Sequence, residues 1–167
     1  MQLGRRQFLK WSAMTAASLA ALPRPATAKV VNDIPYRTLG KVGVEVSILG
    51  VGGGHIGSNM SEADAIRLMR TAVDEGINFF DNAWEYSRGA SEERMGKALK
   101  DGYRDKVFLM TKVLARSAEG AQQQLETSLR RLGVDYVDLW QIHSVGTFGP
   151  DDKERVYTKG VLDVARR

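Results

Sequence analysis

From residue 36 onward, short apolar runs of strand length alternate with longer stretches whose apolar residues recur every three or four positions. The short runs predict buried strands, and the longer stretches predict amphipathic helices. Because each strand is followed by a helix, the pattern predicts an α/β protein with a parallel sheet. The predicted strands are residues 47–51, 77–81, 107–111 and 137–142, preceded by a hairpin with strands at 36–39 and 44–46.

Serine and glycine residues mark the ends of the predicted helices. Ser61 and Gly76 bracket the first helix, Ser117 and Gly133 bracket the third, and Ser91 begins the second. A serine hydroxyl can accept a hydrogen bond from an amide of the first helical turn, and glycine readily adopts the left-handed conformation that ends many helices. These residues therefore predict where the three helices start and stop.

The predicted elements amount to about four β/α units. A (β/α)8 TIM barrel has eight such units and typically about 250 residues. We therefore expect residues 29–167 to be the N-terminal half of a barrel, with a loop at 144–152 and the start of another helix at 160–167. Half a barrel has unpaired strand edges, so the isolated chain is expected to be poorly soluble and inactive.

The basic excess of the chain lies in its first 28 residues. The formal net charge is +4, and this segment carries four basic side chains and no acidic one. The remainder is neutral, so we do not expect a nucleic-acid partner. The four basic residues of the segment are Arg5, Arg6, Lys10 and Arg24.

Residues 1–28 have the features of a signal peptide. A charged start precedes an apolar run at residues 11–22, and Ala26-Thr27-Ala28 forms a small-x-small cleavage pattern. The run is shorter than the roughly 20 residues that span a bilayer, so no stable membrane anchor is expected. The paired Arg5 and Arg6 resemble the twin-arginine export motif, which implies the twin-arginine export machinery as a partner and a periplasmic location. An ordinary Sec signal is the alternative.

Cysteine is absent, and only two histidines are present, His55 and His143. The absence of cysteine excludes disulfides, thiolate nucleophiles and sulfur-ligated metals. A metal-dependent hydrolase using both histidines and Asp81 would need more ligands than these three scattered residues. No metal site is therefore expected.

Polar residues stand at the carboxyl ends of three otherwise apolar strands, where barrel enzymes build their active sites. They are Asp81, Lys112 and His143, and Tyr86 follows Asp81 on the next loop. Because residues two apart in a strand face the same way, each polar residue shares a face with apolar residues of its own strand. If those apolar residues fill the barrel, the polar ones lie at its mouth.

The segments that contain these residues closely resemble the aldo-keto reductase family. The resemblance extends over nearly all of the chain after the signal segment, in the same order and spacing. Its main motifs are Asn78-Phe79-Phe80-Asp81-Asn82-Ala83-Trp84-Glu85-Tyr86, Phe108-Leu109-Met110-Thr111-Lys112 and Val137-Asp138-Leu139-Trp140-Gln141-Ile142-His143. Further matches are Arg37-Thr38-Leu39-Gly40, Ser91-Glu92-Glu93 and Leu132-Gly133-Val134-Asp135-Tyr136-Val137-Asp138.

The resemblance implies transfer of hydride from NADPH, or NADH, to the carbonyl carbon of a small aldehyde or ketone. Tyr86 would then be the general acid that protonates the resulting alkoxide, helped by the Lys112 ammonium, which stabilises a phenolate. Asp81 would hold that ammonium in place. His143 would donate a hydrogen bond to the substrate oxygen.

A glycine-rich loop follows the strand at 47–51. Its glycines Gly52, Gly54 and Gly57 match the G-x-G-x-x-G pattern of Rossmann dinucleotide-binding domains, which is an alternative fold. Against it, residues 58–60 separate the last glycine from the helix cap, whereas the fingerprint opens a helix directly. In the resemblance, Gly53 and Gly54 with Asp81 instead lie close to the nicotinamide ribose.

The resemblance leaves several points open. Many family members carry a threonine and a bulky residue where this chain has Gly53-Gly54-His55, so loop contacts and substrate preference are not fixed by it. Trp84 either lines the substrate pocket or covers the barrel rim. A non-catalytic nucleotide-binding or regulatory subunit on the same barrel is the alternative function. The substrate, the choice of NADP over NAD and the oligomeric state are not predicted.

Overall fold

The structure of the chain is a computed structural model that describes residues 29–158 and 160–164. The predicted signal peptide, residues 1–28, lies outside the described residues, as does the end of the helix predicted at 160–167. Within the described ranges, no helix is both long enough and apolar enough to cross a membrane.

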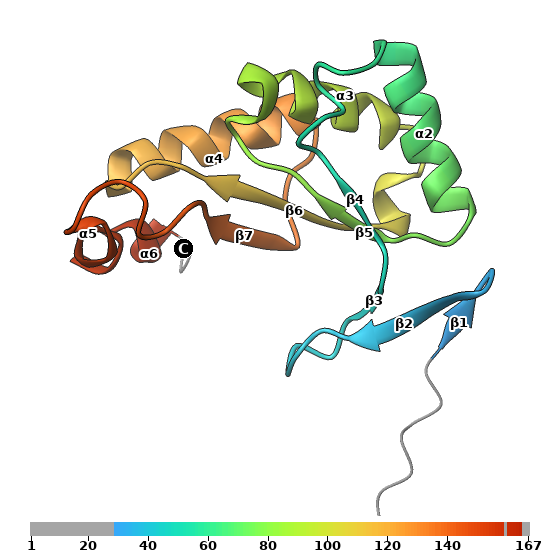
Figure 1. The fold of residues 1–167 in the computed structure, drawn as a ribbon, viewed down its shortest axis with the longest axis horizontal. Coiled ribbons are helices and arrows are strands. Elements are labelled where there is room, and N and C mark those ends of the chain that lie inside the picture. The colour runs from blue at the N-terminus through green and yellow to red at the C-terminus, as the bar shows by residue number, and fades with distance from the viewer. Residues whose placement is uncertain (1–28, 159, 165–167) are drawn as a thin grey trace, which may run out of the picture.

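A four-stranded parallel sheet forms the centre of the fold, and three helices pack on one of its faces (Figure 1). The strands lie side by side in chain order, as in successive β/α units of a barrel. A Rossmann sheet instead changes direction in its strand order and has helices on both faces, so that alternative is wrong. The strands are β4 (Gly50–Gly52), β5 (Phe79–Asp81), β6 (Phe108–Val113) and β7 (Leu139–Ile142), and the helices are α2 (Glu62–Asp74), α3 (Ala90–Ala98) and α4 (Ala118–Leu132).

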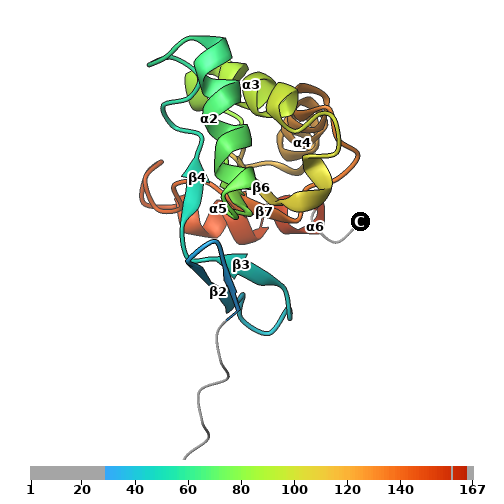
Figure 2. The ribbon, with the colours of Figure 1, turned by 90° about the vertical axis from the view of Figure 1, so that its right-hand side faces the viewer.

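An antiparallel three-stranded sheet precedes the parallel one and lies beyond its end in both ribbon views (Figure 2). It consists of β1 (Val30–Val31), β2 (Ile34–Thr38) and β3 (Glu45–Ser47). The predicted hairpin is confirmed, because β2 pairs with β3 around the expected turn. β1 was not predicted.

The buried strand predicted at 47–51 is wrong at its centre. Ser47 ends β3 and exchanges hydrogen bonds with Asn78, its amide donating to Asn78 Oδ1 (2.7 Å) and its hydroxyl accepting from the Asn78 amide (3.0 Å). Ile48 and Leu49 lie between two strands, each 55% exposed, and β4 starts only at Gly50. An apolar run alone did not distinguish one strand from a link between two sheets.

The predicted ends of the first and third helices are confirmed. Ser61 caps α2 by accepting from the amide of Asp64 (3.1 Å), and Ser117 caps α4 by accepting from Gly120 (3.3 Å). Gly133 ends α4 in the left-handed region at φ 65°. The second helix differs, because α3 starts at Ala90 after a 3-10 turn, η1 (Tyr86–Gly89), and the hydroxyl of Ser91 does not cap it.

The hydrophobic core lies between the sheet and the three helices. The side chains of Phe80 and Leu109 point from the strands into it, where they meet Met69 of α2 and Met95 of α3. Residues of the opposite alternation face away from the helices, and among them the rings of Phe79 and Phe108 stack at 5.8 Å. The alternation along each strand therefore separates a covered face from a face without helices.

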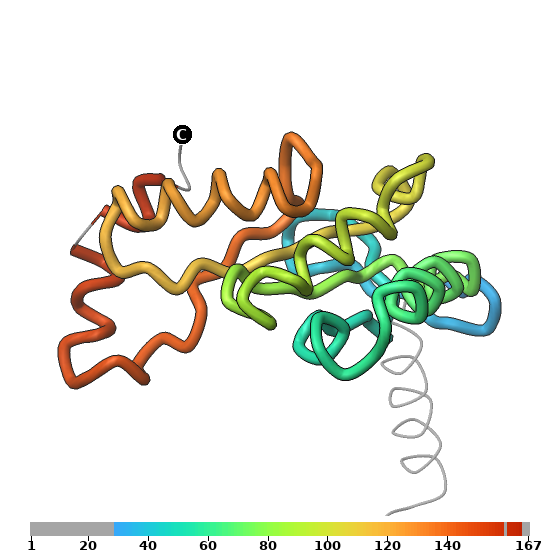
Figure 3. Tube along the Cα trace, turned by 90° about the horizontal axis from the view of Figure 1, so that it is seen from above, coloured from blue at the N-terminus to red at the C-terminus, as the bar shows by residue number. Residues whose placement is uncertain are grey.

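The chain after β7 contains more helix than predicted. Two short helices follow β7, namely α5 (Asp152–Thr158) and α6 (Val161–Val164). Earlier in the chain, a second short 3-10 turn, η2 (Arg104–Lys106), precedes β6. The predicted loop at 144–152 is confirmed up to Asp151, and α6 lies within the predicted helix at 160–167. α5 was not predicted. α6 packs against α4, beside which it runs in the view from above (Figure 3).

Candidate active site

The parallel register of β5, β6 and β7 brings the four predicted site residues together at the carboxyl ends of these strands. Asp81 is the last residue of β5, Lys112 the next to last of β6, and His143 follows β7. The backbone ladder continues past the strands, since the amide of Trp84 donates to Lys112 O (3.1 Å) and that of His143 to Val113 O (2.8 Å). The loop that starts at Trp84 then carries Tyr86 over the strand ends.

The ammonium of Lys112 is the centre of the site. It donates a hydrogen bond to Asp81 Oδ1, a second to Asn82 O (2.9 Å), and lies 3.5 Å from the Tyr86 hydroxyl. The Lys112 side chain is only 11% exposed, whereas that of Asp81 is 37% exposed. A largely buried ammonium is thus neutralised by one carboxylate and directed at one phenol.

Tyr86 and His143 face each other at the carboxyl ends of the parallel strands. Their rings meet edge to face at 5.6 Å with an interplanar angle of 82°. A small oxygen-containing group bound beside both rings could accept hydrogen bonds from the phenol and the imidazole together.

Glu85 also contributes to the site, although sequence analysis gave it no role. Its Oε1 lies 2.8 Å from His143 Nδ1, which is the distance of an ion pair when the imidazole is protonated. The ring nitrogen does not reach the geometry of a hydrogen bond to it. The only sequence signal was its place immediately before Tyr86 on the same loop.

A buried ion pair next to His143 was also missed. Arg116 Nε donates to Asp152 Oδ1 (2.6 Å), and the two side chains are 4% and 0% exposed. The same guanidinium donates to the carbonyl of His143 (2.7 Å), while Asp152 Oδ2 accepts from the amide of Gly146 (2.6 Å). The pair therefore ties the start of α5 to the backbone of the site histidine.

The Arg116–Asp152 pair predicts a pH dependence of stability. The hydrogen bond from Arg116 is the main reason why the pKa of Asp152 lies below its ordinary value, with the Gly146 amide adding to the effect. A carboxyl whose pKa is lowered by folding stabilises the folded state above its unfolded pKa of about 3.9, and this stabilisation is lost as pH falls through the folded pKa.

We expect Asp152→Asn to unfold at lower urea concentration than the wild-type protein at pH 7, because the buried Arg116 loses its counter-charge. The difference should start to shrink as pH falls below about 4, where the carboxyl of the unfolded chain is protonated, and should disappear only below the lower pKa of folded Asp152. Urea unfolding curves of both proteins between pH 3 and pH 7 check this. A difference that stays constant over this range would contradict the role of the pair.

The two glycines expected near a cofactor have different surroundings. A Cβ on Gly53 would lie 2.6 Å from Asn82 Oδ1 and 2.9 Å from Ser91 Oγ, so side-chain packing within the protein requires this glycine. The hydroxyl of Ser91 donates a hydrogen bond to the carbonyl of Gly53 (2.7 Å) instead of capping a helix. A Cβ on Gly54 would meet nothing within 4 Å.

Trp84 contacts a side chain of α4. Its ring packs against the guanidinium of Arg131 on α4 at 5.6 Å, and its carbonyl accepts from the same side chain (2.9 Å). Its Nε1 is buried without a hydrogen-bond partner in the described residues. Whether Trp84 lines the substrate pocket or covers the rim stays a prediction.

The exposed part of Asp81 and the free space at Gly54 could accommodate a nicotinamide ribose. Lys112 occupies Oδ1 of Asp81, and the side chain remains 37% exposed, which leaves acceptor capacity for a ligand hydroxyl. The described residues fit this part of a dinucleotide. Within them, no three His, Cys, Asp or Glu side chains are grouped to hold a metal ion.

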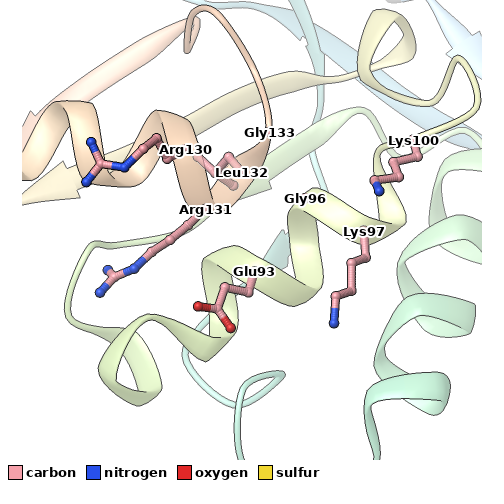
Figure 4. A pocket seen from close by; sticks show the side chains of 8 residues that line it. All are labelled: Glu93, Gly96, Lys97, Lys100, Arg130, Arg131, Leu132 and Gly133. Carbon is pink, nitrogen blue, oxygen red and sulfur yellow. The ribbon is translucent and has the colours of Figure 1, made fainter.

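A cavity of about 420 Å³ lies between α3 and α4, and none of its lining residues belongs to the four site residues (Figure 4). Gly96 lets the two helices approach closely here, since a Cβ on it would lie 2.6 Å from the carbonyl oxygens of Arg131 and Leu132. Two of its cations, Lys97 and Arg131, are paired with Glu62 and Glu92. The cavity is lined by Glu93, Gly96, Lys97, Lys100, Arg130, Arg131, Leu132 and Gly133.

Comparison with known proteins adds independent information. The model of the aldo/keto reductase family matches residues 48–156. The aldo-keto reductase YhdN of Bacillus subtilis is 36% identical over 146 residues, which cover 78% of this chain and 44% of that protein. The chain spans less than half the length of the curated relatives it matches.

Solved structures give the same result. A Pseudomonas aeruginosa protein named as an aldo-keto reductase overlays with a TM-score of 0.70 and 30% identity, over 84% of this chain and 57% of that one. An aldo/keto reductase from Klebsiella pneumoniae, solved with NADP and acetate, overlays with a TM-score of 0.60 and 28% identity, over 72% of this chain and 44% of that one. The expected α/β barrel architecture is confirmed, and the chain forms part of it.

Proposed function

The chain belongs to the aldo/keto reductase family, and from this membership we propose that the complete protein is an oxidoreductase that reduces aldehyde or ketone carbonyls with NAD(P)H. The observation that carries the proposal is the position of the Lys112 ammonium, which contacts both the Asp81 carboxylate and the Tyr86 hydroxyl. A lysine placed in this way can prepare a phenol to release its proton. The activity is proposed for the whole protein, because this chain spans less than half the length of the curated relatives it matches.

Tyr86 is the proposed general acid. A reduced nicotinamide, when bound, would supply the hydride for the new C–H bond, and the electrons of the carbonyl π bond would move to the oxygen. Tyr86 then transfers its hydroxyl proton to that oxygen, which gives the alcohol and a phenolate. The Lys112 ammonium, 3.5 Å from the phenol oxygen, stabilises the phenolate, and Asp81 keeps the ammonium in place.

His143 is proposed to orient the substrate. Its ring meets the Tyr86 ring edge to face, so a carbonyl oxygen bound to one can be reached by the other. A hydrogen bond from the imidazole would polarise the carbonyl as negative charge develops on its oxygen.

NADP is the proposed cofactor, with NAD as the alternative. The Klebsiella pneumoniae relative was solved with NADP, which supports a nicotinamide dinucleotide here. In this chain Asp81 and the open space at Gly54 would meet the nicotinamide ribose, and Gly53 would act by allowing the loop to pack on Asn82. Trp84 would line the substrate pocket, with covering of the barrel rim as the alternative.

We further propose that the protein is exported in folded form through the twin-arginine route and acts in the periplasm. The support is the sequence of residues 1–28, with Arg5-Arg6 ahead of a short apolar run and the small residues that end at Ala28. Export of a folded protein would suit an enzyme that acquires its nucleotide in the cytoplasm.

One experiment tests activity and location together. The complete protein is expressed in a bacterium that has the twin-arginine machinery, and NADPH oxidation with a panel of aldehydes and ketones is measured in periplasmic and cytoplasmic fractions. We expect carbonyl-dependent oxidation in the periplasm, and a shift of that activity to the cytoplasm when Arg5 and Arg6 are both replaced by Lys. If the activity stays in the periplasm after this replacement, the proposed export route is wrong. If neither fraction shows activity, the proposed reductase function is wrong.

Residues 29–167 expressed alone serve as the matched fragment in the same assay. We expect no carbonyl-dependent oxidation from this fragment, because its sheet has a face without helices and two strands with an unpaired edge. Turnover by the fragment would show that the remaining barrel is not needed for activity.

A further inference from the structure

The loop that carries Tyr86 has an unfavourable backbone conformation. Three consecutive residues that follow the tyrosine adopt positive φ, namely Ser87 (50°), Arg88 (55°) and Gly89 (99°). Residues with a Cβ rarely adopt this conformation, so it is energetically unfavourable for Ser87 and Arg88. Contacts from outside the loop must therefore hold it, and through it Tyr86, in place.

One such contact is made by Arg131, in the last turn of α4. Its Nη1 donates to the carbonyl of Trp84 (2.9 Å), two residues before Tyr86. On the other side of the tyrosine, a Cβ on Gly89 would lie less than 3.0 Å from the Arg131 guanidinium. Arg131 thus lies against the loop at both of its ends, and glycine is required at position 89 by the available space as well as by φ.

Arg131 is fixed in turn by Glu92, in the first turn of α3. Glu92 Oε2 lies 3.2 Å from Arg131 Nη1, and the Glu92 side chain is fully buried. A carboxylate at the start of one helix and a guanidinium at the end of another each complement the local helix dipole. Glu92 also accepts a hydrogen bond from the hydroxyl of Thr111 (2.7 Å), which is likewise fully buried.

Thr111 connects this cluster to Lys112, the second partner of the contact between ammonium and phenol. It precedes Lys112 in β6, and its side chain points to the helices while that of Lys112 points to the site. Glu92 therefore joins the strand of Lys112 to the loop of Tyr86 through two polar contacts. Both partners of the 3.5 Å contact between the ammonium and the phenol are held by the same carboxylate.

We propose that Glu92, Arg131 and Thr111 are positioning residues that set the distance between the Lys112 ammonium and the Tyr86 hydroxyl. This inference rests on the proposed reductase function. The three residues lie on the helix side of the sheet and act through the backbone of β6 and of the Tyr86 loop. Loss of the cluster is expected to slow proton transfer while the binding of NADPH is retained.

The test uses the complete protein with Thr111→Val, which removes one hydroxyl at nearly constant volume, and Thr111→Ser, which keeps the hydroxyl. We expect kcat to fall on the order of 10-fold in Thr111→Val, with KM for NADPH within about 2-fold of wild type, because small misplacements of reacting groups have large effects on rate. Thr111→Ser should recover most of kcat. Ser128→Ala, which removes another buried hydroxyl from α4, is the matched control and should leave kcat unchanged.

Glu92→Gln, made in parallel, keeps the size of the side chain but removes the charge that holds Arg131, and it should lower kcat in the same way. Urea unfolding of every variant gives the loss of stability, against which kcat of the folded protein is compared. A wild-type kcat in Thr111→Val and Glu92→Gln would overturn the proposal, and so would an equal loss in Thr111→Val and Thr111→Ser. Failure of the reductase function itself would instead be seen as a lack of carbonyl-dependent NADPH oxidation by the wild-type protein.

Discussion

Tyr86→Phe in the complete protein is expected to lower kcat for carbonyl reduction by about 10²–10⁴-fold, the usual contribution of a positioned general acid. The substitution removes only the hydroxyl oxygen and retains the ring that meets His143 edge to face. Lys112 keeps its contacts with Asp81 and with the carbonyl of Asn82, so the remainder of the site should persist. The loss should therefore appear in catalysis and hardly in folding.

Steady-state rates of NADPH oxidation, together with NADPH binding followed by fluorescence titration, separate the two effects. NADPH affinity is expected to stay within a few-fold of wild type. Tyr136→Phe is the matched control, because Tyr136 is 58% exposed and its ring contacts Arg104 rather than the site. Near-normal turnover by Tyr86→Phe would show that another group supplies the proton.

Lys112→Met is expected to have the second largest effect, with kcat reduced on the order of 10²-fold. The substitution keeps an unbranched side chain but removes the charge next to the phenol oxygen and leaves Asp81 without its partner. A phenolate next to an uncompensated carboxylate is less stable, so Tyr86 gives up its proton less readily.

The rates of Lys112→Met, Asp81→Asn and the double variant measure the coupling between the two residues. We expect the double variant to be no slower than Lys112→Met, because Asp81 acts through the ammonium that this variant lacks. Lys100→Met, an exposed lysine of the cavity between α3 and α4, is the control for the loss of a positive charge. Independent, multiplicative losses would contradict the arrangement in which Asp81 serves Lys112.

The features that were predicted correctly are those whose physical causes are local in the chain. The caps at Ser61 and Ser117 depend on amides three residues away, and the left-handed Gly133 on the end of its own helix. The proximity of Asp81 to Lys112 followed from one further rule, that adjacent parallel strands end at the same edge. Most of the fold and the proximity of the four predicted site residues could therefore be read from the sequence.

The features that were missed depend on contacts between distant segments. Arg116 and Asp152 are 36 residues apart, and Glu92 and Arg131 are 39 apart, so no local pattern pairs them. Charged residues are rarely buried unless they are paired, and without the partner each of these reads as a surface residue. The prediction for Ile48 was wrong in the opposite sense, since this apolar residue was expected to be buried and is exposed.

The alternation of side chains along β6 has a consequence for how this site can change during evolution. Thr111 and Lys112 are consecutive, yet one serves the packing of α3 and the other the chemistry at the sheet edge. Insertion or deletion of one residue in β6 would exchange their faces, placing a hydroxyl in the site and an ammonium among the helices. Substitutions within β6 keep the two faces apart, so we expect changes of length to be confined to the loops that follow the strands.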